Sequence, residues 1–266
     1  MKMPINSFKA ALGKGRQLAG IRTSLCSPTI VDVLASCGFD YVYIDTEHTP
    51  ADMQIVQAQL RALHSTSALV RPAANDEVLI KKLLDIGVQN LLIPMVQDAA
   101  SARRAVAATR YSPRGSRGVC GRSGANAYGR IEDYYTRADD EICVITMLET
   151  RGALDRLEEI AGVDGVDALW VGPGDLAADF GVLTSGGPAH PEVRKALEDA
   201  VQRAQRAGKP IGIPAPTEAQ AKELAAAGCA LITVSSDVDI LAREGDRLAA
   251  LMNDCLHVSA DTQARD

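Results

Sequence analysis

The 266-residue sequence contains no run of about 18 apolar residues, so nothing in it predicts a membrane-spanning helix. Its first 20 residues carry basic charge but no continuous apolar stretch of the kind a secretory signal needs. Lysine and arginine number 28 against 34 acidic residues, and this formal net charge of −6 argues against a broad nucleic-acid interface. We therefore expect a cytoplasmic protein that binds neither membranes nor nucleic acids.

The six cysteines form no CxxC pair and no recognisable metal-ligand motif. In a chain of this length they are not needed as disulfide staples, so we expect a reducing compartment and mostly buried thiols. Schiff-base chemistry would need a lysine at the end of a strand, and Lys81, Lys82 and Lys209 do not end any predicted strand. These absences argue against thiolate and lysine-based catalysis.

Short apolar or β-branched runs alternate with segments of helical period along the whole chain. Hydrophobic residues make up 47% of the sequence and charged residues 23%, which is the composition of a globular protein with a sizeable core. Eight strands joined by helices in about 250 residues predict an α/β fold, a single (β/α)8 barrel over residues 1–266 with a flexible tail over about 256–266. A doubly wound open sheet is the alternative. The predicted strands cover residues 19–25, 41–45, 68–71, 90–93, 143–149, 168–172, 210–214 and 230–235.

The predicted helices carry start and stop signals. Ser27 with Pro28 begins one helix, and Asn75, Asp76 and Glu77 begin another. Glycines close four helices, each just before a predicted strand: Gly38, Gly87, Gly208 and Gly228. Two long loops, 111–137 and 181–191, interrupt the alternation, and we expect both to cover the mouth of the active site.

Charged side chains follow several of the predicted strands. Barrel enzymes carry their catalytic groups at the carboxyl ends of strands and in the loops that follow. This position selects Asp45, Glu47 and His48 after the second strand, Arg71 after the third, Glu149 after the fifth and Asp175 after the sixth.

Glu149 and Asp175 both end apolar runs, where an unpaired buried carboxylate is costly. Two converging carboxylates suit Mg²⁺ or Mn²⁺, which fill their remaining positions with water and substrate oxygens. The alternative is a capping glutamate and an N-cap aspartate at helix starts. The position in the barrel favours the metal site.

Three further features have both a functional and a structural interpretation. The run GPGDL over residues 172–176 presents backbone N–H groups to an anion, or is an ordinary strand-to-helix turn. His48, oriented by Asp45 or Asp85, exchanges protons near neutral pH, or is a surface residue. Arg71 binds an enolate oxygen or a carboxylate through its fork, or forms a surface ion pair.

Four sequence blocks carry a resemblance that spans nearly the whole chain. They are GFDYVYIDTEHTP (38–50), KKLLDIGVQNLLIPMVQDA (81–99), RYSPRGSRGV (110–119) and VGPGDLAADFG (171–181). Together they resemble the HpcH/HpaI aldolase family, the metal-dependent class II pyruvate aldolases.

The resemblance implies a role for each strand-end residue. Glu149 and Asp175 would hold Mg²⁺, Mn²⁺ or Co²⁺, and Arg71 would stabilise the pyruvate enolate. His48 matches the catalytic base. Asp85 matches the acid that raises the basicity of this histidine. In relatives that acid comes from a neighbouring subunit.

The same resemblance extends to substrate and assembly. In the GPGDL run, which starts at Gly172, the backbone amides of Gly174 and Asp175 would bind the pyruvate carboxylate. The family forms hexamers, as trimers of dimers, with an exchanged C-terminal helix, for which the segment after Asp237 is the candidate. Two pocket positions depart from the family. Met147 replaces a glutamine and Arg22 a tryptophan found in many relatives, and Arg22 adds a cation for an anionic substrate.

The function that follows is reversible cleavage of a 4-hydroxy-2-oxo acid from sugar-acid or aromatic breakdown to pyruvate and an aldehyde. The alternatives are an oxaloacetate decarboxylase that uses the same enolate site, and a non-catalytic barrel that binds a keto acid.

Overall fold

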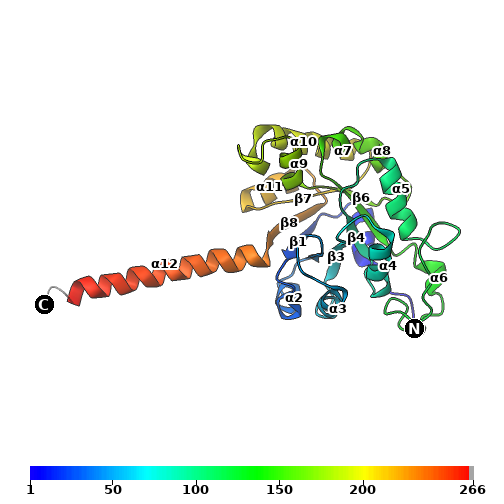
Figure 1. The fold of residues 1–266 in the computed structure, drawn as a ribbon, viewed down its shortest axis with the longest axis horizontal. Coiled ribbons are helices and arrows are strands. Elements are labelled where there is room, and N and C mark those ends of the chain that lie inside the picture. Colours follow the sequence, from blue (N-terminus) through cyan, green and yellow to red (C-terminus); the bar gives the residue numbers. More distant parts are fainter. Residues whose placement is uncertain (264–266) are drawn as a thin grey trace.

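The computed structural model describes the backbone of residues 1–263 and the side chains of residues 1–256. Within this part of the chain eight parallel strands close into a barrel in sequence order, with β8 returning to pair with β1 (Figure 1). The strands are β1 (Leu18–Thr23), β2 (Tyr41–Asp45), β3 (Ser67–Arg71), β4 (Asn90–Ile93), β5 (Cys143–Leu148), β6 (Ala168–Val171), β7 (Ile211–Pro214) and β8 (Leu231–Ser236). The predicted barrel is confirmed, and the open-sheet alternative is wrong.

Most helices connect two strands and cover the outside of the barrel, whereas the first closes its amino end and the last projects away from it (Figure 1). They are α1 (Ser7–Gly13), α2 (Pro28–Ala35), α3 (Met53–Arg61), α4 (Glu77–Asp85), α5 (Ala99–Ala108), α6 (Tyr134–Arg137), α7 (Arg151–Asp155), α8 (Leu157–Ala161), α9 (Pro173–Asp179), α10 (Pro191–Arg206), α11 (Glu218–Ala226) and α12 (Asp237–Gln263), with a 3₁₀ turn η1 (Gly187–Ala189).

The predicted helix boundaries have visible local causes. Ser27 accepts a hydrogen bond from the Ile30 backbone N–H, and Asp76 caps α4 in the same way. The four predicted stop glycines, Gly38, Gly87, Gly208 and Gly228, all have φ between 67° and 106°. This left-handed conformation is strained for residues with a Cβ, so glycine fixes where each chain segment leaves the helix.

The apolar core has two layers. The larger layer lies between the strands and the surrounding helices, and the smaller fills the barrel interior, where α1 closes the amino end through Phe8 and Leu12. Large rings inside the barrel face glycines: a Cβ on Gly212 would lie 2.3 Å from the Trp170 ring. Close packing of this kind fixes the strand register from which the polar strand ends project.

Burial of the cysteines differs from the expectation. Cys143 and Cys229 are buried, whereas Cys37 and Cys255 are exposed. The prediction of mostly buried thiols is wrong because the turn after α2, which carries Cys37, and the projecting helix α12, which carries Cys255, present those positions to solvent.

The two long loops lie at opposite ends of the barrel. The 181–190 connection joins α9 to α10 at the carboxyl ends of the strands, as expected. The 111–137 segment joins α5 to β5, so it lies at the amino ends, where its Tyr111, Ile131 and Tyr134 pack against Met3. The prediction that this loop covers the mouth of the active site is wrong within one chain, because a helix-to-strand connection returns to the amino end of a strand.

The last helix, α12, extends away from the barrel (Figure 1). It begins at Asp237, whose carboxylate accepts hydrogen bonds from the Thr23 hydroxyl at 2.8 Å and from the Ser24 and Leu25 backbone N–H groups. The segment predicted as a tail, 256–266, is helical up to Gln263, and its last three residues lie outside the described residues. In the described part of the chain no helix is long and apolar enough to cross a membrane.

Candidate active site

A cavity of about 610 Å³ opens at the carboxyl ends of the strands. Seven residues selected from the sequence line it: Arg22, His48, Arg71, Met147, Gly172, Gly174 and Asp175. Asp45 and Glu149 lie directly beneath, each 1% exposed. The structure thus brings the predicted strand-end residues together, with the exception of Asp85.

Arg71 is held by two carboxylates from the end of the neighbouring strand. Its Nε and Nη2 donate to the two Asp45 oxygens at 2.9 and 2.7 Å, and its Nη1 lies 2.7 Å from Glu47 Oε2. The strand register places Asp45 opposite Arg71, so this fork-to-fork pair follows from the β2–β3 pairing. The side chain is only 4% exposed, which excludes the surface ion pair interpretation.

Arg22 shares the same carboxylate. Its Nη2 lies 2.8 Å from Asp45 Oδ2, while its buried Nε has no hydrogen-bond partner among the described residues. Burial by itself would raise the pKa of Asp45, but the hydrogen bonds and charge of Arg71, together with the charge of Arg22, lower it below its ordinary value. Asp45 is therefore an ionised anchor for two guanidinium groups.

Glu149 is a buried carboxyl group without a cationic hydrogen-bond partner. Its Oε2 accepts the Met95 backbone N–H at 2.8 Å. Burial, together with the charges of Asp175 and Glu47, raises the pKa of Glu149 to about 7 against the opposing Met95 hydrogen bond and Arg71 charge. Thr150, not Glu149, caps α7, so the capping alternative is wrong for this residue.

Asp175 lies in the first turn of α9, where Gly172 is the N-cap. Asp175 makes no side-chain cap hydrogen bond, so the N-cap alternative is wrong as well. A Cβ on Gly172 would lie 2.8 Å from Glu149 Oε1, and only glycine leaves this space. The turn brings a second carboxylate towards Glu149.

These two carboxylates fit a divalent cation. A buried glutamate whose pKa is raised by burial and by a neighbouring aspartate is stabilised by positive charge placed between them. No group of three or more acidic, histidine or cysteine side chains that could hold a metal occurs in the described residues. The pair therefore suits an ion that takes one or two carboxylates and otherwise water and substrate oxygens, as Mg²⁺ does.

The predicted orientation of His48 differs from the structure. Asp45 forms ion pairs with Arg22 and Arg71. The acid nearest to His48 is Glu47, with 3.8 Å between His48 Nε2 and Glu47 Oε2. Asp85 ends α4 at the opposite end of the barrel, where its Oδ1 lies 3.7 Å from Arg117. Neither aspartate orients His48 within one chain, and the His48 side chain is 57% exposed.

Tyr43 and Trp170 also line the cavity, although the sequence analysis did not select them as site residues. A signal for both was present, because Tyr43 precedes Asp45 by two residues and Trp170 precedes Gly172 by two. Side chains two apart on a strand face the same side. The guanidinium carbon of Arg71 lies 5.6 Å from the centre of the Tyr43 ring, so the aromatic wall supports the arginine.

The raised pKa of Glu149 predicts a pH dependence of the metal-free protein. The native state keeps this proton up to about pH 7, whereas the unfolded chain loses it near 4.5. The free energy of unfolding should therefore fall by up to about 3 kcal/mol as the pH rises through this window. Urea unfolding of chelator-treated protein and of Glu149→Gln measures it: the difference between the two should grow with pH, and parallel pH profiles would contradict the assignment.

Fold and site together define a (β/α)8 barrel with a charged cavity at the carboxyl ends of its strands, the arrangement of a barrel enzyme. The family model for HpcH/HpaI aldolase/citrate lyase matches residues 20–243. The chain belongs to the HpcH/HpaI aldolase/citrate lyase family, and it is a carbon–carbon lyase.

Individual relatives agree over nearly the full length. The chain is 46% identical over 252 residues to a pyruvate aldolase from Rhizobium etli, covering 94% of this chain and 98% of the relative. It is 46% identical over 248 residues to a 4-hydroxy-2-oxo-heptane-1,7-dioate aldolase from Shigella sonnei, covering 92% and 94%. A crystal structure of an HpcH/HpaI aldolase/citrate lyase family protein from Burkholderia cenocepacia superposes with a TM-score of 0.89 at 37% identity, covering 93% and 99%.

Proposed function

We propose that the protein is a metal-dependent class II aldolase that reversibly cleaves a 4-hydroxy-2-oxo acid to pyruvate and an aldehyde. The carrying observation is that a buried arginine, a histidine and Asp175 line one cavity, and that Asp175 lies near enough to the buried Glu149 to raise its pKa. The names of the relatives support this reaction class. We also propose that the substrate comes from sugar-acid or aromatic breakdown and that the protein works in the cytoplasm.

Arg71 stabilises the negative charge that develops on the former ketone oxygen when the carbon–carbon bond breaks. Asp45 and Glu47 fix its guanidinium before substrate arrives, so little reorganisation is needed during the reaction. Because the side chain is buried against Tyr43, its charge acts in surroundings with little water.

Glu149 and Asp175 are the residues that would hold the divalent ion, Mg²⁺, Mn²⁺ or Co²⁺. When bound, such an ion supplies a positive charge next to the substrate oxygens. Gly172 keeps the space between the strand ends open, and the backbone N–H groups of Gly174 and Asp175, at the first turn of α9, face no earlier turn of helix. They suit the carboxylate of the keto acid.

His48 is the proposed base for the 4-hydroxyl proton. It lines the cavity with an exposed ring, and histidine is the side chain that most often serves as a general base. Asp85 lies at the opposite end of its own barrel from His48. A role beside His48 therefore requires the Asp85 of another copy. We therefore propose a composite site in which a neighbouring subunit supplies this acid, as the family resemblance implies.

The exposed face of α12 supports a homo-oligomer. Leu241, Leu248, Leu251, Met252 and Leu256 are between 46% and 62% exposed and recur at helical spacing. A row of exposed leucines on a helix that leaves its own barrel is suited to packing on another subunit. We propose that α12 is exchanged between copies, in a hexamer built as a trimer of dimers.

Arg22 is the proposed determinant for an acid group on the aldehyde. Replacement Arg22→Leu should lower kcat/KM for aldol addition of pyruvate to a carboxylate-bearing aldehyde by about 10- to 100-fold, because a charge-assisted hydrogen bond is lost. An uncharged aldehyde of the same length should be affected much less. Comparing the two aldehydes separates lost recognition from a general disturbance of Asp45, and an equal loss on both would contradict the role.

The reaction class is tested by comparing rates on 4-hydroxy-2-oxo acids with rates on oxaloacetate. Faster pyruvate release from the hydroxy-oxo acids supports the aldolase. Release from oxaloacetate alone would instead make the protein a decarboxylase.

A further inference from the structure

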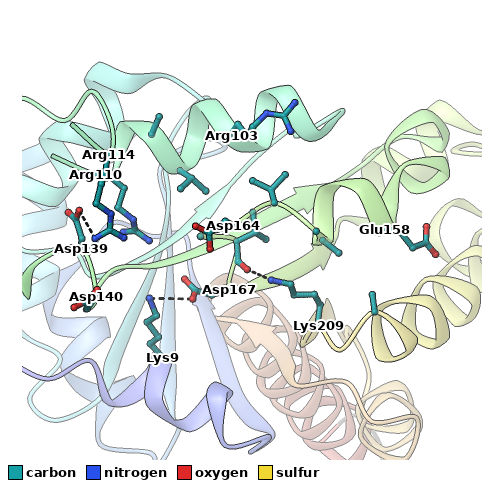
Figure 2. Close-up of a pocket in the computed structure, with 18 residues that line it drawn as sticks. Lys9, Arg103, Arg110, Arg114, Asp139, Asp140, Glu158, Asp164, Asp167 and Lys209 are labelled. Atoms are coloured by element: carbon teal, nitrogen blue, oxygen red, sulfur yellow. Dashed lines mark hydrogen bonds and ion pairs between the residues drawn. The ribbon is translucent and has the colours of Figure 1, made fainter. Parts of the chain in front are cut away.

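A second cavity, of about 960 Å³, lies at the amino ends of the strands, away from the candidate active site. Figure 2 shows it between α5, the α8–β6 connection and the end of α10. Its lining holds five basic and five acidic side chains, all of them labelled in Figure 2.

Most of these charges are satisfied by protein groups. Lys9 Nζ lies 3.3 Å from Asp167 Oδ1, and Arg114 Nη1 lies 3.5 Å from Asp139 Oδ2. Lys209 Nζ donates to the Val166 carbonyl at 2.5 Å. Glu158 pairs with Arg203, outside the cavity lining.

Among the lining cations that the structure describes, Arg110 alone is buried. It is 5% exposed, yet its buried Nη1 has no hydrogen-bond partner, and its guanidinium forms no ion pair with any side chain that the structure describes. Burial lowers the pKa of Arg110 against the opposing charges of Asp139 and Asp167. A cation just after the end of α5 would be expected to bind the free helix carbonyls, but Arg110 donates no side-chain hydrogen bond to them. A buried guanidinium nitrogen without an acceptor is costly, so Arg110 is the lining residue best suited to bind an acceptor from outside the chain.

The acidic side chains of the same lining limit the charge of the ligand that the cavity can bind. Asp140 and Asp164 are exposed, line the same cavity and form no ion pair within the described residues. In Figure 2 Arg110 and Arg114 extend together towards Asp139, with Asp164 and Asp167 on the other side of the cavity. A dianion such as phosphate would meet these carboxylates, and a simple cation would meet the arginines. A molecule that carries one charge of each sign matches both groups.

We propose that this cavity binds a small zwitterion with the chemistry of a free α-amino acid, its carboxylate on Arg110 and its ammonium group towards Asp164. The Arg110 fork matches a carboxylate through two parallel hydrogen bonds. The site is separate from the proposed aldol chemistry, because it is lined by helix-to-strand connections at the other end of the barrel.

Calorimetric titration of the full-length protein with the standard L-amino acids tests the proposal, with acetate, methylammonium and inorganic phosphate as partial probes. We expect at least one amino acid to bind once per chain, and more tightly than all three partial probes. Arg110→Met should weaken this binding at least 10-fold. Arg104→Met, an exposed arginine on α5 outside the cavity lining, and Glu149→Ala in the candidate active site should both leave it unchanged.

Unfolding temperatures of the variants show whether a loss of binding comes from the removed side chain or from a folding defect. Arg110→Met removes a buried charge without a partner, so its unfolding temperature without ligand should not fall below that of the unaltered protein. Arg110→Lys provides a second variant, which keeps the charge but loses the fork and should bind weakly. The proposal is overturned if no amino acid binds, if phosphate binds more tightly, if Arg110→Met binds normally, or if Glu149→Ala abolishes binding.

Discussion

Replacement Glu149→Ala is expected to lower metal-dependent pyruvate release by at least about 10³-fold, because it removes one of the two carboxylates that hold the cation. The chain should still fold. Glu149 is 1% exposed with a pKa raised to about 7, so in the metal-free protein its charge opposes folding at neutral pH. Steady-state rates with saturating Mg²⁺ or Mn²⁺, and circular dichroism of the same samples, measure the two effects.

The matched control is Glu159→Ala, an exposed acid on α8. It should keep full activity and the same metal dependence. A Glu149→Ala protein that retained normal turnover, or that lost activity only because it failed to fold, would remove the support for Glu149 as a metal ligand.

Replacement Arg71→Leu is expected to reduce both activity and stability. Turnover should fall by about 10²- to 10³-fold because the charge beside the ketone oxygen is lost. The free energy of unfolding should fall by about 3 kcal/mol, because Asp45 stays buried with only Arg22 to neutralise it. Rate measurements with urea unfolding of the same variant give both numbers.

The double variant Asp45→Asn/Arg71→Leu separates these two contributions. It removes the uncompensated carboxylate, so it should recover part of the stability but none of the activity. Recovery of activity together with stability would show that Arg71 supports the fold and takes no direct part in the reaction.

The strands and the strand-end residues could be predicted because each depends on local pattern. Apolar runs of four to seven residues between turn residues mark the barrel strands, and parallel strands bring their carboxyl ends to one edge whatever their register. Glu149 and Asp175 were selected in this way, and the structure brings them near enough for Asp175 to raise the pKa of Glu149.

Contacts that depend on register or on a second chain could not be predicted. That Asp45 binds Arg71 and Arg22, and does not orient His48, follows from the pairing of three strands, which the sequence does not display. Asp85 lies at the other end of its own barrel, so only an assembly can bring one beside His48. The unpaired Arg110 has no sequence signal, because its burial arises from α5, the α8–β6 connection and α10 meeting.

Pyruvate release from a panel of 4-hydroxy-2-oxo acids, by chelator-stripped protein with and without added Mg²⁺, Mn²⁺ or Co²⁺, tests the proposed function most directly. We predict negligible release from the stripped protein and restored release on addition of at least one of these metals. Release that is indifferent to the chelator, or no release with any metal, would contradict a metal-dependent aldolase built on Glu149 and Asp175.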